Sequence, residues 1–237
     1  MDIRALQLAS RFSLPPNSLG YCGKNTAPEK FKRCAIYGTC EGVEDEIKEF
    51  IVLFPYLKTL SQITKFPIFS HKVVEAYWLG NDELETAKPK HYSILLENFK
   101  KQGVPVWLTE ELSNKEPRKF IPNHLFQILH VGVGRASGAV PYNLGSINNC
   151  MIRWGKVEKT SGKKLWITLN SLKVVGKRYK TTLVNKTLPF VETFLGPVKV
   201  GDIVAVHWNQ VVKILTVDEE GKLSSWTRTV LDSFRPK

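Results

Sequence analysis

Residues 150–175 read CMIRWGKVEKTSGKKLWITLNSLKVV. Through this stretch, β-branched and aromatic residues alternate with polar ones, which is typical of strands that bury one face. The run Thr160-Ser161-Gly162-Lys163 is a turn signal between two such strands. The same pattern continues toward the C-terminus, and strands are expected at 151–158, 164–170, 172–175, 180–184, 203–207 and 211–217. Short strands joined by tight turns predict a small closed β-barrel, because closure leaves no open edge.

The residues before this stretch have the pattern of helices. Apolar residues recur at spacings of three and four between Val43 and Leu57, which is the stripe of an amphipathic helix. Pro55 lies inside the stripe and is expected to kink or split it. Ser70 is an N-cap candidate for a further helix that stops at Gly80. This half of the chain is therefore expected to be mainly helical.

Two further segments complete the expected fold. Another helix is expected over 91–102, where Gly103 follows as a stop signal. The nearly continuous apolar stretch at 123–138 fits either a buried helix or a short strand. The predicted fold class is α+β, with a helical domain at 1–147 and a small, OB-like β-barrel at 148–237.

Charge is distributed unevenly between these two regions. Residues 148–237 contain 16 Lys/Arg against 7 Asp/Glu, a net charge of +9, whereas residues 1–147 contain 18 against 15, a net charge of +3. A strongly basic module suggests an acidic partner, either nucleic acid or an acidic protein surface. The chain has no apolar run long enough to span a bilayer and no secretory signal pattern, so we expect a cytoplasmic protein.

Four cysteines are present, and none of their spacings forms a CxxC pair, which disfavours a zinc ribbon. In a cytoplasmic protein the default state of a cysteine is the reduced thiol. Cys34 and Cys40 are interpreted as buried thiols that pack as small hydrophobic side chains. Cys22 and Cys150 have more unusual neighbours and are candidate site residues.

Two motifs in the C-terminal region lie in a distinctive order. In the first, Gly155-Lys156-Val157 begins five residues after Cys150. In the second, Val200-Gly-Asp-Ile-Val-Ala-Val-His207 is followed by an apolar strand and then by an acidic run, Asp218-Glu219-Glu220. Residues 150–237 thereby resemble the HypC-type chaperones of [NiFe]-hydrogenase maturation, which begin with a cysteine and contain a similar Gly-Asp…His segment.

This resemblance implies a carrier or chaperone rather than an enzyme. HypC-type proteins pass an Fe(CN)2CO unit between a maturation scaffold protein and the hydrogenase large subunit, which are the partners implied here. Carried over to this sequence, Cys150 would be the thiolate that holds the iron and His207 its neighbour; no other cofactor is implied. Arg153 and Lys156 would favour the thiolate form. The alternative is that Cys150 is a buried thiol and His207 an ordinary strand residue.

The N-terminal half contains a second unusual stretch, Gly20-Tyr21-Cys22-Gly23, directly after a Pro-Pro pair. The whole chain resembles an uncharacterised prokaryotic family that shares this loop, the segment Ala76-Tyr-Trp-Leu-Gly-Asn81 and the C-terminal motifs. In alternative hypotheses, Cys22 is a second thiol ligand, or it is the nucleophile of a Cys–His enzyme with His124 or His130 as its base. The other interpretation is a packed turn with two core histidines.

A further alternative is a nucleic-acid-binding barrel. Trp166 and Tyr179 are aromatic side chains that can stack on bases. Phosphates would be contacted by a basic cluster consisting of Lys173, Lys177, Arg178, Lys180 and Lys186. A basic surface that merely contacts solvent is the competing interpretation of this cluster.

Overall fold

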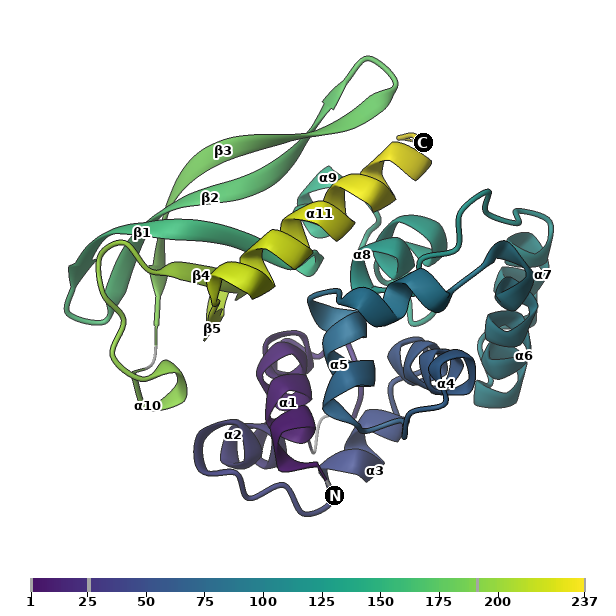
Figure 1. Ribbon diagram of the computed structural model, residues 1–237, viewed down its shortest axis with the longest axis horizontal. Helices are drawn as coiled ribbons and strands as arrows, with labels where there is room; N and C mark the ends of the chain where they lie inside the picture. Colours follow the sequence, from purple (N-terminus) through teal and green to yellow (C-terminus); the bar gives the residue numbers. More distant parts are fainter. Residues whose placement is uncertain (1, 25–26, 191, 237) are drawn as a thin grey trace. The chain divides into compact units, whose positions relative to one another are not determined.

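The computed structural model describes residues 2–24, 27–190 and 192–236 and divides into two compact units. The first unit ends at Tyr142 and the second begins at Asn143, whereas the sequence placed the boundary at 147/148. The first unit is helical and the second contains a five-stranded antiparallel sheet (Figure 1). The α+β fold class is confirmed.

The helical unit begins with two helices that pack on each other, α1 (Ile3–Ser18) and α2 (Pro28–Tyr37). The remaining elements follow in order: α3 (Val43–Lys48), α4 (Leu53–Thr64), α5 (His71–Trp78), the short 3-10 helices Asp82–Thr86 and Pro89–His91, α6 (Tyr92–Gln102), α7 (Val106–Ser113) and α8 (His124–Gln127), which continues as a π-helix over Ile128–Gly132. None of the described helices is both long and apolar enough to cross a membrane.

Local capping chemistry sets several of these boundaries as the sequence predicted. The Ser70 side chain accepts a hydrogen bond from the Val73 N–H and caps α5, and Gly103 ends α6 in the left-handed conformation. The stripe from Val43 to Leu57 does split into two helices, α3 and α4. The break precedes Pro55, which lies in the first turn of α4, where the missing N–H of proline costs no hydrogen bond.

A disulfide joins Cys34 to Cys40, so the interpretation of both residues as reduced thiols was wrong. Gly38, in the left-handed conformation at the C-cap of α2, reverses the chain and brings the two Cα atoms to 4.4 Å. This distance is within the range that a cystine accepts, and the spacing of two cysteines in a sequence does not reveal it. Both residues remain buried, as expected.

The C-terminal unit begins with α9 (Leu144–Cys150) and contains the strands β1 (Arg153–Ser161), β2 (Lys164–Val175), β3 (Arg178–Pro189), β4 (Ile203–His207) and β5 (Gln210–Ile214). The hydrogen-bonded strand order is β3-β2-β1-β4-β5. A short helix, α10 (Glu192–Leu195), precedes β4, and α11 (Val217–Ser233) follows β5. The segments 164–170 and 172–175 thus form one strand. The strand expected at 211–217 stops earlier, because Thr216 caps α11 through a capping box with Glu219.

One apolar cluster forms the core of the sheet. Its buried members come from β1, β2, β3, β4 and β5: Val157, Leu165, Ile167, Leu169, Leu188, Val204, Val206 and Val211. Cα atoms of the end strands β3 and β5 come within 8 Å of each other, so the sheet curves strongly around this core. Among the described residues no hydrogen-bonded ladder joins β3 to β5, and the sheet is therefore barrel-like without the closing pair.

Candidate functional site

Cys150 and His207 end two neighbouring elements of the sheet unit. Cys150 is the last residue of α9, and His207 is the last residue of β4. The turn that follows β4 has Trp208 and Asn209 both at positive φ, 48° and 57°, as a two-residue type I′ hairpin requires. The Trp208 N–H donates a hydrogen bond of 2.7 Å to the carbonyl oxygen of Asn149, which fixes this hairpin against the end of α9.

The sulfur and the imidazole come close together as a result. Cys150 Sγ and a ring nitrogen of His207 lie within 4.8 Å of each other. Both residues are buried, with exposed fractions of 8% and 1%. A metal bound by sulfur at about 2.3 Å and by imidazole nitrogen at about 2.1 Å keeps these donors no more than about 4.4 Å apart. A small side-chain adjustment therefore suffices for both atoms to bind one ion.

A buried arginine adds positive charge to the same hairpin. Arg153 begins β1, and its Nη2 donates a hydrogen bond of 2.9 Å to Oδ1 of Asn209. Burial lowers the pKa of Arg153 to about 10, so the guanidinium stays protonated at neutral pH. Within the described part of the chain, Arg153 forms no ion pair with a carboxylate. Lys156 lies farther along β1, opposite Ile203, and is exposed.

The two sequence motifs also bond to each other. The Val157 N–H donates to the carbonyl oxygen of Asp202 at 2.9 Å, and the Gly201 N–H donates to the carbonyl oxygen of Val157 at 2.8 Å. Gly155 has a packing role, because a Cβ at this position would lie 2.4 Å from the carbonyl oxygen of Thr168. These contacts explain the glycines and Val157 by structure, and they leave Cys150 and His207 as the residues with ligand chemistry.

Cys22 lies in the turn after α1, whereas His124 begins α8 and His130 lies in the π-helix. The helix α1 continues through the Pro-Pro pair to Ser18, and Asn17 Nδ2 then donates a hydrogen bond of 2.8 Å to the Cys22 carbonyl oxygen. The residue is exposed overall, yet burial around its sulfur atom raises the pKa of the thiol to about 12. A thiol with this pKa is protonated at neutral pH, whereas a nucleophilic cysteine needs a lowered pKa.

His124 and His130 each bond to a tyrosine of the helical unit. The Tyr77 hydroxyl lies 2.8 Å from His124 Nδ1, and the Tyr92 hydroxyl lies 2.7 Å from His130 Nε2. Tyr92 also donates to the Leu112 carbonyl oxygen at 2.9 Å. Burial raises the pKa of Tyr92 well above its usual range. Each of these histidines thus has a hydrogen-bonding role in the helical core.

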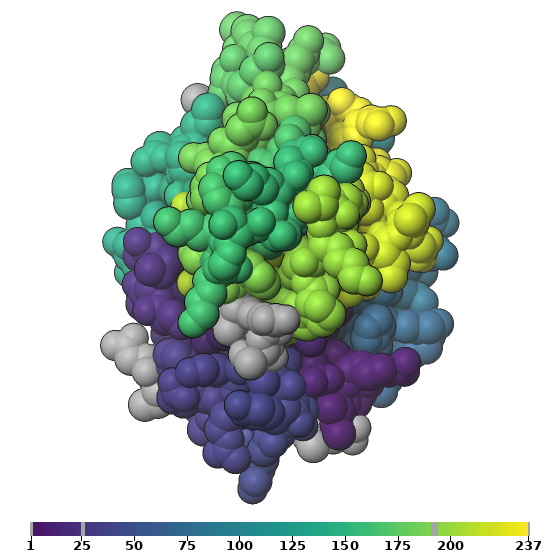
Figure 2. Space-filling view, turned by 90° about the vertical axis from the view of Figure 1, so that its left-hand side faces the viewer, coloured from purple at the N-terminus to yellow at the C-terminus, as the bar shows by residue number. Residues whose placement is uncertain are grey.

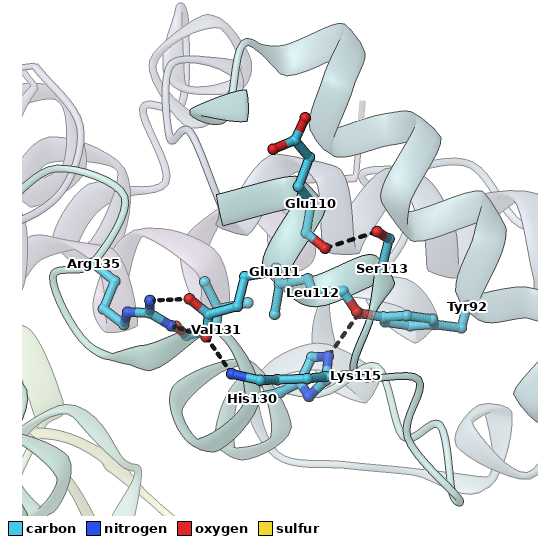
Figure 3. Close-up of polar contacts among 9 residues, drawn as sticks. All are labelled: Tyr92, Glu110, Glu111, Leu112, Ser113, Lys115, His130, Val131 and Arg135. Atoms are coloured by element: carbon cyan, nitrogen blue, oxygen red, sulfur yellow. Dashed lines mark hydrogen bonds and ion pairs between the residues drawn. The ribbon is translucent and has the colours of Figure 1, made fainter. Parts of the chain in front are cut away.

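Sequence reasoning missed an ion-pair cluster beside His130, shown in Figure 3. Arg135 Nη2 lies 2.7 Å from Glu111 Oε2, and Lys115 Nζ lies 2.6 Å from Glu111 Oε1. Hydrogen bonds from these two cations lower the pKa of Glu111 to about 2. The i,i+4 spacing of Glu111 and Lys115 was visible in the sequence, but Arg135 lies in a loop 24 residues away. The cluster ties α7 to the segment after the π-helix.

The residues proposed for nucleic-acid binding do not lie at one place. Lys173 and Lys180 are directly opposite each other in the β2–β3 ladder, near the turn that holds Lys177. Tyr179 is buried and therefore offers no open face for stacking. Trp166 lies at the other end of β2, where it pairs with Thr187 and where Lys186 also lies.

Taken together, these features define an α+β protein with a helical unit and a basic, barrel-like sheet unit that presents a buried Cys–His pair. The chain belongs to DUF6390, a family of unknown function, whose profile matches residues 2–236. Among curated proteins and solved structures, no match was found.

Proposed function

We propose that the protein is a carrier or chaperone for a metal centre, and that Cys150 and His207 of the sheet unit hold the cargo. The observation that carries this proposal is the separation of at most 4.8 Å between the Cys150 sulfur and a ring nitrogen of His207, two buried donor atoms. A thiolate and an imidazole together suit soft or borderline transition metals rather than Mg²⁺ or Ca²⁺.

The cargo we propose is iron with cyanide and carbon monoxide ligands, Fe(CN)2CO. Thiolate sulfur is a soft donor and suits iron that already has strong-field ligands. The buried guanidinium of Arg153 favours an anionic complex at this end of the sheet. The resemblance of residues 150–237 to HypC-type chaperones points to the same cargo and to partners in hydrogenase assembly.

The test is to co-express the protein with a hydrogenase maturation system, purify it without oxygen, and record its iron content and infrared spectrum. We expect bound iron with CN and CO bands in the wild-type protein. Cys150→Ser should lose them, whereas Cys22→Ser, which removes the other free thiol, should retain them. Equal bands in Cys150→Ser, or a wild-type protein without iron, would contradict the proposal.

His207 needs a variant that separates loss of a ligand from loss of folding, because the residue is buried. His207→Gln keeps a polar side chain of similar size, and circular dichroism checks that the sheet persists. We expect weaker iron binding in a folded protein. As a control, His91→Gln removes a histidine of the helical unit and should leave the iron content unchanged.

A further inference from the structure

The segment that contains strands β1–β3 has an unusual excess of positive charge. Residues 153–189 contain ten Lys/Arg and a single acidic residue, Glu158. Within the described part of the chain, none of these cations forms an ion pair; the ion pairs of this unit are Lys213–Glu219 and Lys222–Asp218. Atoms of this part of the chain, coloured from teal to green, reach the surface in the view of Figure 2. Nine of these ten cations are exposed and therefore available to an anionic partner, whereas Arg153 is buried.

A hollow of about 420 Å³ is lined by residues of β1, β2 and β3. Trp166 forms part of its wall, and Lys159 Nζ lies 5.1 Å from the centroid of the Trp166 ring. Thr168, Asn185 and Thr187 supply hydrogen-bonding groups to the same wall. Glu158 and Lys186 also line the hollow, which thus combines a half-buried aromatic ring, two cations, one carboxylate and polar side chains.

Strand register places two more lysines beside Trp166. Lys159 is directly opposite Trp166, and Lys156 is opposite Thr168, two residues along β2. Lys164 precedes Trp166 by two residues and therefore shares its face of the strand. Three lysines, Lys156, Lys159 and Lys164, accordingly surround the ring on one face of the sheet. We call Trp166 and these three lysines the Trp166 face.

We propose that the Trp166 face binds single-stranded nucleic acid, with a base stacked on the Trp166 ring and phosphates contacted by the three lysines. Stacking on an aromatic side chain within a basic groove is how proteins bind single strands with little sequence preference. An acidic protein segment would match the charge, but its carboxylate groups have no planar ring to stack on Trp166, whereas every nucleotide has one. Binding there requires neither Cys150 nor His207.

The test measures fluorescence anisotropy of a labelled single-stranded oligothymidylate of about 12 nucleotides, with the full-length protein. We expect binding that weakens steeply between about 50 and 200 mM salt. Trp166→Ala should weaken binding about 10-fold or more, and Trp166→Phe, which keeps a ring, should weaken it less. No binding at the lowest salt concentration would overturn the proposal.

Two triple variants that remove the same charge distinguish specific binding at the Trp166 face from non-specific attraction between nucleic acid and exposed lysines. Replacing Lys156, Lys159 and Lys164 by Gln should weaken binding and reduce the salt slope by about 2, since each phosphate contact on a single strand contributes about 0.7. Replacing Lys173, Lys177 and Lys180 by Gln removes the same charge at the hairpin tip and should have a smaller effect. Equal losses in both variants, or equally tight binding of polyglutamate, would overturn the proposal.

Discussion

His130 and His207 are both buried, but the two units of the molecule surround them differently. In the helical unit, His130 accepts or donates a hydrogen bond with the Tyr92 hydroxyl at 2.7 Å. In the sheet unit, His207 has the sulfur of Cys150 within 4.8 Å of a ring nitrogen. A phenol beside an imidazole forms a hydrogen bond, whereas a thiol and an imidazole are both groups that can bind a transition metal.

Charge follows the same division. The helical unit contains 18 Lys/Arg and 15 Asp/Glu, and ion pairs such as Arg135–Glu111 join many of them. The sheet unit contains 16 against 7, and its strands β1–β3 have almost no carboxylates. The comparison teaches that the helical unit pairs many of its charged residues with one another, whereas the cations of strands β1–β3 have few carboxylates near them in the sequence.

The largest expected effect tests the packing that supports the sheet unit. In Gly155→Ala, the new Cβ would lie 2.4 Å from the Thr168 carbonyl oxygen and 2.7 Å from Leu169 Cα, both backbone atoms. We expect the free energy of unfolding of this unit to fall by about 3 kcal/mol. Amide hydrogen exchange should accelerate in β1, β2 and β4 and stay unchanged in the helical unit.

Gly221→Ala is the matched control, because a Cβ there meets open space within α11. It should be neutral or stabilise the sheet unit by up to about 1 kcal/mol, through the higher helix propensity of alanine. If Gly155→Ala exchanges as slowly as Gly221→Ala, the close approach of β1 and β2 is not a constraint on the fold.

The second effect concerns the disulfide of the helical unit. Reducing Cys34–Cys40 opens a short covalent loop, and we expect a loss of about 2 kcal/mol in the stability of this unit. Amide exchange should rise in α1 and α2, which pack on each other, and remain slow in the strands. Thiol labelling followed by mass spectrometry gives an independent check: before reduction, two free thiols should react in the unfolded protein, and four would disprove the bond.

The third effect tests the structural role of the helical-unit histidine. Tyr92→Phe removes the hydrogen bonds to His130 and to the Leu112 carbonyl, and should cost about 1 kcal/mol, measured by urea denaturation. The exposed Tyr37 offers a control, because Tyr37→Phe should change nothing. The metal content should be the same in the wild-type protein, in Tyr92→Phe and in Tyr37→Phe. Loss of metal from Tyr92→Phe would contradict the assignment of a purely structural role to His130.

The smallest effect is a pH dependence in the helical unit. The folded pKa of Glu111, about 2, lies below its ordinary value of 4.5 because Arg135 and Lys115 donate hydrogen bonds to it. Its stabilising contribution is therefore fully present above pH 4.5 and is lost as the pH falls toward 2. For a partly exposed pair we expect about 0.2–1 kcal/mol.

A comparison of denaturation midpoints between pH 5 and pH 2.5 measures this contribution. Glu111→Gln should flatten the dependence, whereas Glu97→Gln, at an exposed pair with Lys100, should not. Identical pH profiles for Glu111→Gln and the wild-type protein would show that the cluster contributes no stability.

The sequence predicted those parts of the fold that depend on local chemistry. The Ser70 cap, the Gly103 stop and the change from helices to strands near residue 150 all follow from residues adjacent in the chain. The Cys34–Cys40 bond was not predicted, because it depends on the left-handed conformation of Gly38.

The candidate sites likewise contain contacts that depend on chain conformation and were therefore not predicted from the sequence. The resemblance of residues 150–237 to HypC-type chaperones predicted that Cys150 and His207 lie close together, and their donor atoms do lie within 4.8 Å of each other. The neighbours of Trp166 were not predictable, since a register shift between Val157 and Lys159 decides that Lys159 lies opposite the ring. The Arg153–Asn209 bond likewise depends on a hairpin turn rather than on spacing.

The most direct test of the central claim is an anaerobic titration of the purified protein with Co²⁺, followed by absorption spectroscopy. Our account predicts a thiolate-to-cobalt charge-transfer band in the wild-type protein and in Cys22→Ser, and its loss in Cys150→Ser. A band that persists in Cys150→Ser, or a wild-type protein that binds no Co²⁺ through sulfur, would contradict the claim that the sheet unit is built to hold a metal.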